Sequence, residues 1–146
     1  PVWNHDQIIR NNVLAWNRDA QVWGWFDVGD ERHWPKSMQE ASPVARPSSL
    51  EDLNLRFQSN LYCPAAGQGL FNWGTAWKKH RRYETLEAVQ EELSLDQDSR
   101  VAEFSVEAFA ALDLCVREDS PAVTMGCYPQ GPVPGVRLGT APSRTR

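Results

Sequence analysis

The first third of the chain carries a hydrophobic pattern typical of an amphipathic helix. Its apolar residues recur at intervals of four, three, four and three, which places them on one face of a 3.6-residue period. They are Ile9, Val13, Trp16, Ala20 and Trp23. Asn4 or Asp6 suits the start of such a helix, and Gly24 suits its end. Residues 25–28 are too few and too aromatic to continue that face, so we expect a strand or an extended segment there.

The same periodicity predicts helices over residues 48–63, over 73–93 (as one long helix or two short ones) and over 100–117. Their apolar stripes are Leu50, Leu53, Phe57 and Leu61, then Leu86, Val89 and Leu93, then Val101, Phe104, Ala108, Leu112 and Cys115. In the last helix, Phe104, Val106 and Ala108 also alternate, so a strand is the alternative there.

The end of the chain has a different character. From Ser120 onward, prolines alternate with glycines and no acidic residue occurs, so we expect an extended arm. The predicted fold is therefore mainly α: a single domain of about four amphipathic helices around a Trp-rich core, with one short extended segment. Residues 1–119 would form the helical domain and residues 120–146 the Pro/Gly-rich extended arm.

Composition narrows the class of protein. The 146 residues suffice for one domain, and the net charge of −4 argues against nucleic-acid binding over the whole surface. The three cysteines include no Cys-x-x-Cys pair, and we see no secretory leader, so we expect reduced thiols and an intracellular location, in the cytoplasm or in a particle assembled there. No apolar run approaches the ~20 residues of a membrane span.

Two short patterns contain residues that could bind a ligand, but their spacing matches no known binding motif. A turn after the expected extended segment holds potential metal ligands, namely Asp27, Asp30, Glu31 and His33. Their spacing matches neither an EF-hand nor a zinc signature, so we expect a solvated turn and no metal. Gly67 and Gly69 lack the strand and the Gly-Lys-Ser/Thr of a phosphate loop, so we expect a flexible connection and no cofactor.

A catalytic reading depends on Cys63, with His33 or His80 as its base. The chain has no Gly-x-Ser-x-Gly elbow, and His5, His33 and His80 lie far apart in the sequence. We therefore expect no enzyme, and a small intracellular enzyme using Cys63 or a histidine is the third hypothesis.

A basic run suggests a nucleic-acid contact. Lys78, Lys79, Arg81 and Arg82 lie between Trp77 and Tyr83, and cations beside aromatic rings suit phosphates and stacked bases. Eleven acidic residues against two arginines follow between Glu84 and Asp119, so pairing on a solvated surface competes with that reading. A nucleic-acid-contacting module that uses this run and the Arg-bearing tail is the second hypothesis.

Seven tryptophans exceed the obvious needs of a core of this size, and exposed aromatic residues dominate binding energy at interfaces. The first hypothesis is therefore a structural or protein–protein interaction subunit of a larger assembly, such as a capsid-associated or capsid-decorating protein. Its partners would be protein, either copies of the chain or a larger scaffold protein. The residues expected to bind the partner are Trp73, Trp77, Arg137, Arg144 and Arg146.

Overall fold

The structure, a computed structural model, describes residues 6–25, 54–74, 81–134 and 136–141. Its main feature is a pair of stacked coils, each of which contributes three short strands. The first coil consists of β1 (Ile8–Arg10), β2 (Val13–Ala15) and β3 (Ala20–Trp25). The second coil consists of β4 (Arg56–Gln58), β5 (Leu61–Cys63) and β6 (Gly69–Gly74).

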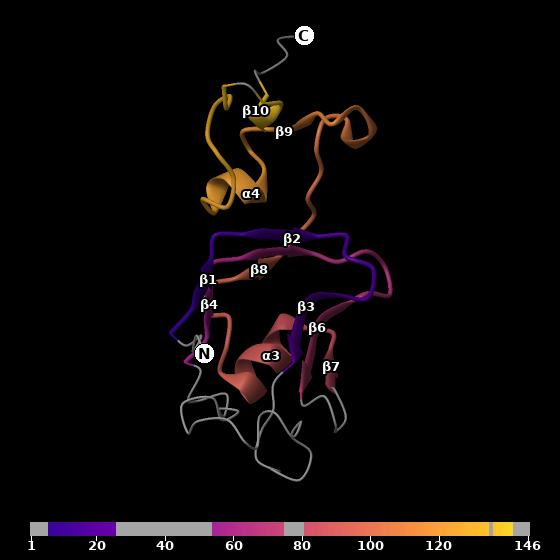
Figure 1. Ribbon diagram of the computed structural model, residues 1–146, viewed down its shortest axis with the longest axis vertical. Coiled ribbons are helices and arrows are strands. Elements are labelled where there is room, and N and C mark those ends of the chain that lie inside the picture. Colours follow the sequence, from indigo (N-terminus) through magenta and orange to yellow (C-terminus); the bar gives the residue numbers. More distant parts are fainter. Residues whose placement is uncertain (1–5, 26–53, 75–80, 135, 142–146) are drawn as a thin grey trace, which may run out of the picture.

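Each strand of the first coil pairs in parallel with its counterpart in the second. β1 lies on β4, β2 on β5 and β3 on β6, and the register aligns Ile9 with Phe57, Leu14 with Tyr62 and Val22 with Phe71. In Figure 1 these three pairs form the left, upper and right sides around a common interior. The arrangement is a parallel β-solenoid of two coils.

A third layer covers the second coil on the side away from the first. It begins with β7 (Arg81–Tyr83), which pairs antiparallel with β6, and ends with β8 (Arg100–Val101), which pairs parallel with β5. Between them lies the helix α3 (Leu86–Leu93), whose first turn is capped by the Thr85 hydroxyl accepting from Ala88 N. The buried face of α3 closes this end of the interior with Leu86 and Val89.

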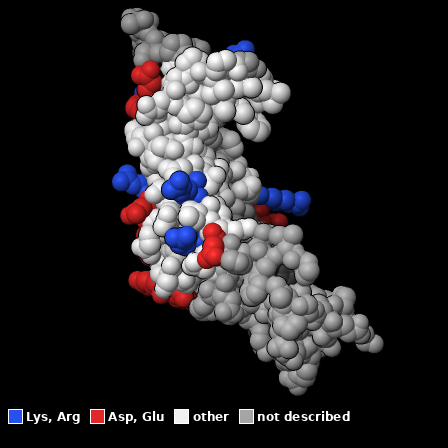
Figure 2. All heavy atoms as spheres, turned by 60° about the vertical axis from the view of Figure 1, so that its left-hand side comes forward, with Lys and Arg blue, Asp and Glu red and all other residues white. Residues whose placement is uncertain are grey.

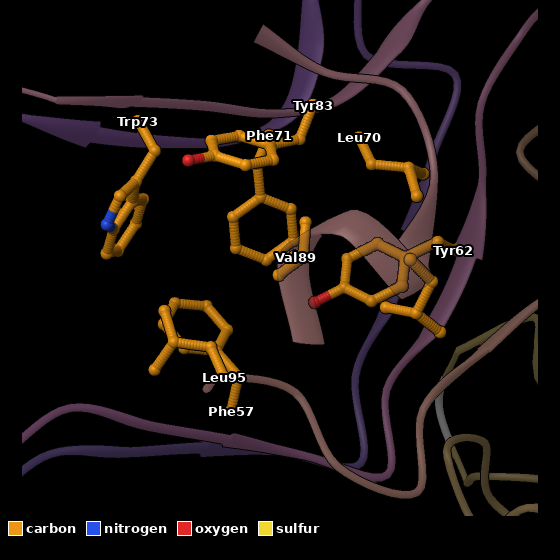
Figure 3. Close-up of a cluster of buried hydrophobic side chains, with 9 residues drawn as sticks. Phe57, Tyr62, Leu70, Phe71, Trp73, Tyr83, Val89 and Leu95 are labelled. Atoms are coloured by element: carbon orange, nitrogen blue, oxygen red, sulfur yellow. The ribbon is translucent and has the colours of Figure 1, made fainter. Parts of the chain in front are cut away.

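The core is aromatic and lies inside the second coil. Phe71 is fully buried, and its ring centroid lies 5.6 Å from that of Phe57, 5.8 Å from that of Tyr62 and 5.8 Å from that of Trp73. Figure 3 shows these rings around Phe71, with Val89 and Leu95 approaching from the third layer. Such edge and tilted contacts are the preferred geometries of aromatic pairs.

The C-terminal part packs against the upper side of the solenoid (Figure 1). It contains the short helix η3 (Phe109–Ala111), β9 (Leu114–Val116), α4 (Pro121–Thr124) and β10 (Leu138–Thr140), and β10 pairs in parallel with β9. Its contacts reach the corners of both coils. Asn11 Nδ2 donates to Met125 O at 3.3 Å, and Cys127 Sγ donates to Ser59 O at 3.1 Å.

The predicted mainly α fold is wrong, because the described chain is mostly β. Most of the segment expected as the first helix instead forms β1, β2 and β3. The helical stripe did not coincide with the core: Ile9 packs inward, whereas Trp16 and Trp23 are 42% and 54% exposed. The Trp-rich N-terminal core was wrong for the same reason.

The other predicted helices are also corrected, with one exception. The described part of 48–63 forms β4 and β5, and 100–117 forms β8, η3 and β9. Of the helix expected over 73–93, the described residues 73–74 and 81–93 are helical only at Leu86–Leu93, with the predicted residues Leu86 and Val89 buried. Strands form here because pairing with β1 and β2 and the burial of Phe57, Leu61 and Tyr62 override a weak local propensity for helix.

The last part of the chain is not a uniformly extended arm where the structure describes it. α4 forms there, because Ser120 caps it through Ala122 N and Pro121 occupies its first turn. β10 pairs with β9, so strands from the two sides of residues 119 and 120 lie next to each other. This part of the chain therefore packs on its own body.

Candidate interaction surface

The corners between neighbouring strands repeat from layer to layer. Asn11, Ser59 and Asp98 each adopt positive φ, at 54°, 52° and 60°, and the residue types Asn and Asp tolerate this conformation best after glycine. Each is followed by a small polar residue, Asn12, Asn60 or Ser99. These three residues stack above one another and form a polar ladder.

In the ladder, the main-chain N–H groups all donate in one direction, toward the next layer. Asn12 N donates to Asn60 Oδ1 at 3.0 Å, and Asn60 N donates to Ser99 Oγ at 2.8 Å. Asn60 Nδ2 also donates back to Ile9 O at 3.0 Å. Asn60 is fully buried and accepts at its side-chain oxygen, whereas the exposed Asn12 accepts nothing at Oδ1 from any residue that the structure describes.

The first coil has one edge without a strand partner in the described ranges. In β2, the main-chain groups that face β5 are those of alternate residues: Asn12 O accepts from Leu61 N at 2.8 Å, and Trp16 N donates to Cys63 O at 3.0 Å. The main-chain groups of Val13 and Ala15 therefore point the opposite way. Among the described residues, none pairs with that outer side of β1, β2 or β3.

The apolar interior is also less covered at this end. Ile9, Leu14 and Val22 point inward and pack against the core, yet all three remain partly exposed. Their partners one coil further on, Phe57, Tyr62 and Phe71, are 7%, 0% and 0% exposed. We call the outer edges of β1, β2 and β3, together with Ile9, Leu14, Val22 and Asn12, the open coil face.

Gly24 belongs to the wall beside this face. A Cβ at this position would lie 1.8 Å from the Trp73 ring, so the indole packs directly over the Gly24 backbone. Trp73 is only 4% exposed. Trp73, which was expected to bind a partner, therefore lies in the core, and Gly24 leaves the space that its ring occupies.

Of the other four residues expected to bind a partner, the structure describes one. Arg137 is exposed and forms an ion pair with Asp113. Trp77, Arg144 and Arg146 lie outside the described residues. Of the two residues that the structure describes, Trp73 lies in the core and Arg137 at the surface, and neither belongs to the open coil face.

The ion pair of Arg137 has a measurable consequence for pH dependence. The Arg137 guanidinium, helped by Cys115 N donating to Oδ1 at 3.3 Å, lowers the pKa of Asp113. A carboxyl group with a lowered folded-state pKa stabilises the fold above its ordinary value of about 3.9 and loses that effect as the pH falls through the folded-state pKa. We predict that Arg137→Gln raises the pKa of Asp113 toward its ordinary value, as measured by carboxyl NMR titration.

Asp119 provides the matched control, because Arg117 lowers its pKa in the same way. Arg137→Gln should leave the titration of Asp119 unchanged, and Arg117→Gln should shift Asp119 alone. An Asp113 titration that does not move in the Arg137 variant would contradict the assigned ion pair.

The described part of the basic run is engaged by acidic neighbours. Arg81 forms an ion pair with Glu92, and Arg82 donates to Gly67 O at 2.6 Å and lies 3.4 Å from a Glu84 oxygen. Lys78 and Lys79 lie outside the described residues. On the face drawn in Figure 2, basic side chains stand apart with acidic ones beside them, and the upper part is almost free of charge. No continuous basic surface is seen on that face.

The residues of the enzymatic hypothesis do not form a constellation in the described chain. Cys63 Sγ accepts from Phe104 N at 3.3 Å, and burial raises the pKa of the Cys115 and Cys127 thiols. The three histidines, and with them the acidic turn at 27–33, lie outside the described residues. Within the described ranges, no group of three or more His, Cys, Asp or Glu residues could hold a metal ion.

One polar cluster is buried beneath the ladder. Asp96, 1% exposed, accepts from the Ser99 hydroxyl and from Asn60 Nδ2 at Oδ1. Burial and, second, the nearby charge of Asp96 raise the pKa of Tyr62 far above its ordinary value, so its phenol stays neutral. These side chains are sealed from solvent, so the cluster holds the corner of the coils in place and offers no access to a substrate.

Comparisons of the chain with protein-family models, curated proteins and solved structures found no match. No helix in the described ranges has the length and apolar character needed to cross a membrane.

The sequence analysis did not predict the open coil face, although the sequence contains a signal for it. Two segments share one pattern, in which a pair of polar residues lies between two groups of three residues. They are 8–15, with the pair Asn11-Asn12, and 56–63, with the pair Ser59-Asn60. In each, an apolar residue precedes and follows the pair by the same distance. This repeat identifies the two-residue corner, and an internal repeat is the mark of a solenoid.

Proposed function

We propose that this chain is a structural or protein–protein interaction subunit of a larger assembly, with no catalytic role of its own. The observation that supports the proposal is the difference between the two ends of the solenoid. α3 and Leu95 close the end beyond the second coil, whereas the open coil face has strand edges that no described residue pairs with, and apolar side chains that are only partly buried.

Such an edge favours association because its main-chain donors and acceptors are arranged to pair with another strand. Repeat proteins ordinarily end in a capping unit with a polar outer face, which this end lacks in the described chain. All three cysteines are free, which agrees with assembly in a reducing intracellular compartment. The partner in this proposal is protein.

The test uses two variants at Ala15, whose N–H points away from β5. Ala15→Pro removes this outward donor and spares the hydrogen bonds within the chain, whereas Ala15→Val keeps the donor and serves as the control. We predict that the tagged wild-type chain and Ala15→Val, recovered gently from the source cells, migrate as particles larger than one chain. Ala15→Pro should be recovered mainly as a single chain.

Particle size can be measured by mass photometry, and circular dichroism spectra of the purified variants check that both retain the fold. The proposal is wrong if the wild-type chain is recovered as a single chain, or if the folded Ala15→Pro variant assembles as well as the wild type.

A further inference from the structure

We infer that the partner at the open coil face is a further three-stranded β-coil, stacked in parallel and in the same direction as the two coils present, and that Asn12 Oδ1 receives a main-chain N–H from it. This inference rests on the proposed function and specifies the chemistry of the partner. It follows from three observations: the direction of the hydrogen bonds in the ladder, the three strand edges of the first coil, and the structure at the opposite end of the solenoid.

The ladder sets the direction of stacking. Each coil donates a main-chain N–H at the corner to the polar side chain of the next layer, from Asn12 to Asn60 and from Asn60 to Ser99. Within the described part of the chain, only Asn12 Oδ1, at the start of the series, lacks such a donor. A coil placed before the first one in the same direction supplies this N–H at its own corner.

The amide nitrogen of Asn12 is already engaged within the chain. Asn12 Nδ2 donates to Arg10 O at 3.0 Å and to Asn60 Oδ1 at 3.1 Å, so both of its N–H bonds have acceptors. The contribution of the further coil to Asn12 is therefore the main-chain N–H at Oδ1.

The edges specify a whole coil as the partner. β1, β2 and β3 each pair in parallel with the second coil, so their outer sides offer evenly spaced donors and acceptors on three sides of one interior. A single added strand satisfies one side only. A coil of three strands satisfies all three and brings apolar side chains over Ile9, Leu14 and Val22.

A second copy of the chain does not provide this partner through its described residues. The end of the solenoid that would have to stack on the open coil face carries β7, which is antiparallel, the helix α3 and the two-residue β8. It lacks three parallel edges. A copy turned to meet the face head to head would place Asn12 against Asn12, with both main-chain donors pointing away from the contact.

The experiment adds a coil to the full chain. A second copy of residues 1–48 is fused in front of the intact chain, so that the connection between the added coil and the first coil has the same length as the connection between the first coil and the second. Amide hydrogen exchange of Val13 and Ala15 in the original first coil is the readout. We expect both amides to exchange at least tenfold more slowly in the fusion than in the unfused chain.

Two variants of the original Asn12 test its assigned role in the fusion. Asn12→Ala should return Val13 and Ala15 toward their fast exchange. Asn12→Ser should retain the protection, because Ser99 performs the same acceptor role one layer further on. Equal protection in the Ala and Ser variants would remove Asn12 from the inference.

Three results overturn the partner assignment. In the first, the fusion leaves the exchange of Val13 and Ala15 unchanged. In the second, both amides are already protected in the dilute unfused chain, so that the chain covers its own edge. In the third, their protection in the unfused chain rises with protein concentration, which identifies a second copy as the partner. The proposed function is tested by a different result: it is wrong if the wild-type chain recovered from the source cells is a single chain.

Discussion

Replacing Phe71 by alanine is expected to lower the free energy of unfolding by about 3–5 kcal/mol, the usual cost of removing a large aromatic side chain from a core. Phe71 is fully buried and contacts the rings of Phe57, Tyr62 and Trp73. It also lies opposite Val22 in the register of the coils, so its loss leaves a cavity that both coils border. Urea denaturation followed by circular dichroism measures the change.

Trp16→Ala is the matched control, because the helical pattern assigned Trp16 to the core and the structure does not. Its side chain is 42% exposed and touches the rings of Phe104 and Phe109, at centroid distances of 5.3 and 5.8 Å. We expect Trp16→Ala to cost about 1–2 kcal/mol, since less area leaves contact with the protein. A larger loss for Trp16 than for Phe71 would contradict the placement of the core.

Replacing Asn60 by alanine is expected to destabilise the fold by about 3 kcal/mol. Its side chain is fully buried, accepts from Asn12 N and donates to Ile9 O and Asp96 Oδ1. Alanine leaves these groups without their partner, and an unsatisfied buried polar group costs about 1–3 kcal/mol. The same denaturation experiment measures this loss.

Asn12→Ala in the isolated chain is the control for Asn60→Ala. The two asparagines occupy the same place in successive coils, but Asn12 is exposed, so water replaces its lost hydrogen bonds. We expect a loss of less than about 1 kcal/mol for Asn12→Ala. Equal losses for the two variants would mean that the ladder does not distinguish an inner coil from an open one.

The sequence predicted little of this fold, and particular residues explain why. Ile9 and Leu14 are five positions apart, a spacing that does not share one face of a helix, yet both point into the solenoid because a two-residue corner lies between their strands. Trp16 and Trp23 completed a helical stripe by coincidence and are exposed. The strands are three residues long, too short for alternation to be recognised.

What could be predicted had local causes. Leu86, Val89 and Leu93 share one helix, as predicted, because both its cap and its apolar face are set by residues within the same short segment. Pairing of β1 with β4 joins residues 48 positions apart, and such non-local contacts leave no periodic signal within a window of one element. The open coil face depends on these pairings, so the candidate site was missed together with the fold.

The most direct test of the account is amide hydrogen exchange across β2 in the dilute, intact chain. A strand paired on one side only should show alternation: slow exchange for Leu14 and Trp16, which face β5, and fast exchange for Val13 and Ala15, which face outward. Uniform protection from residue 8 to residue 24 would indicate the helix that the hydrophobic pattern first predicted, or an edge already covered, and either result would contradict the open coil face.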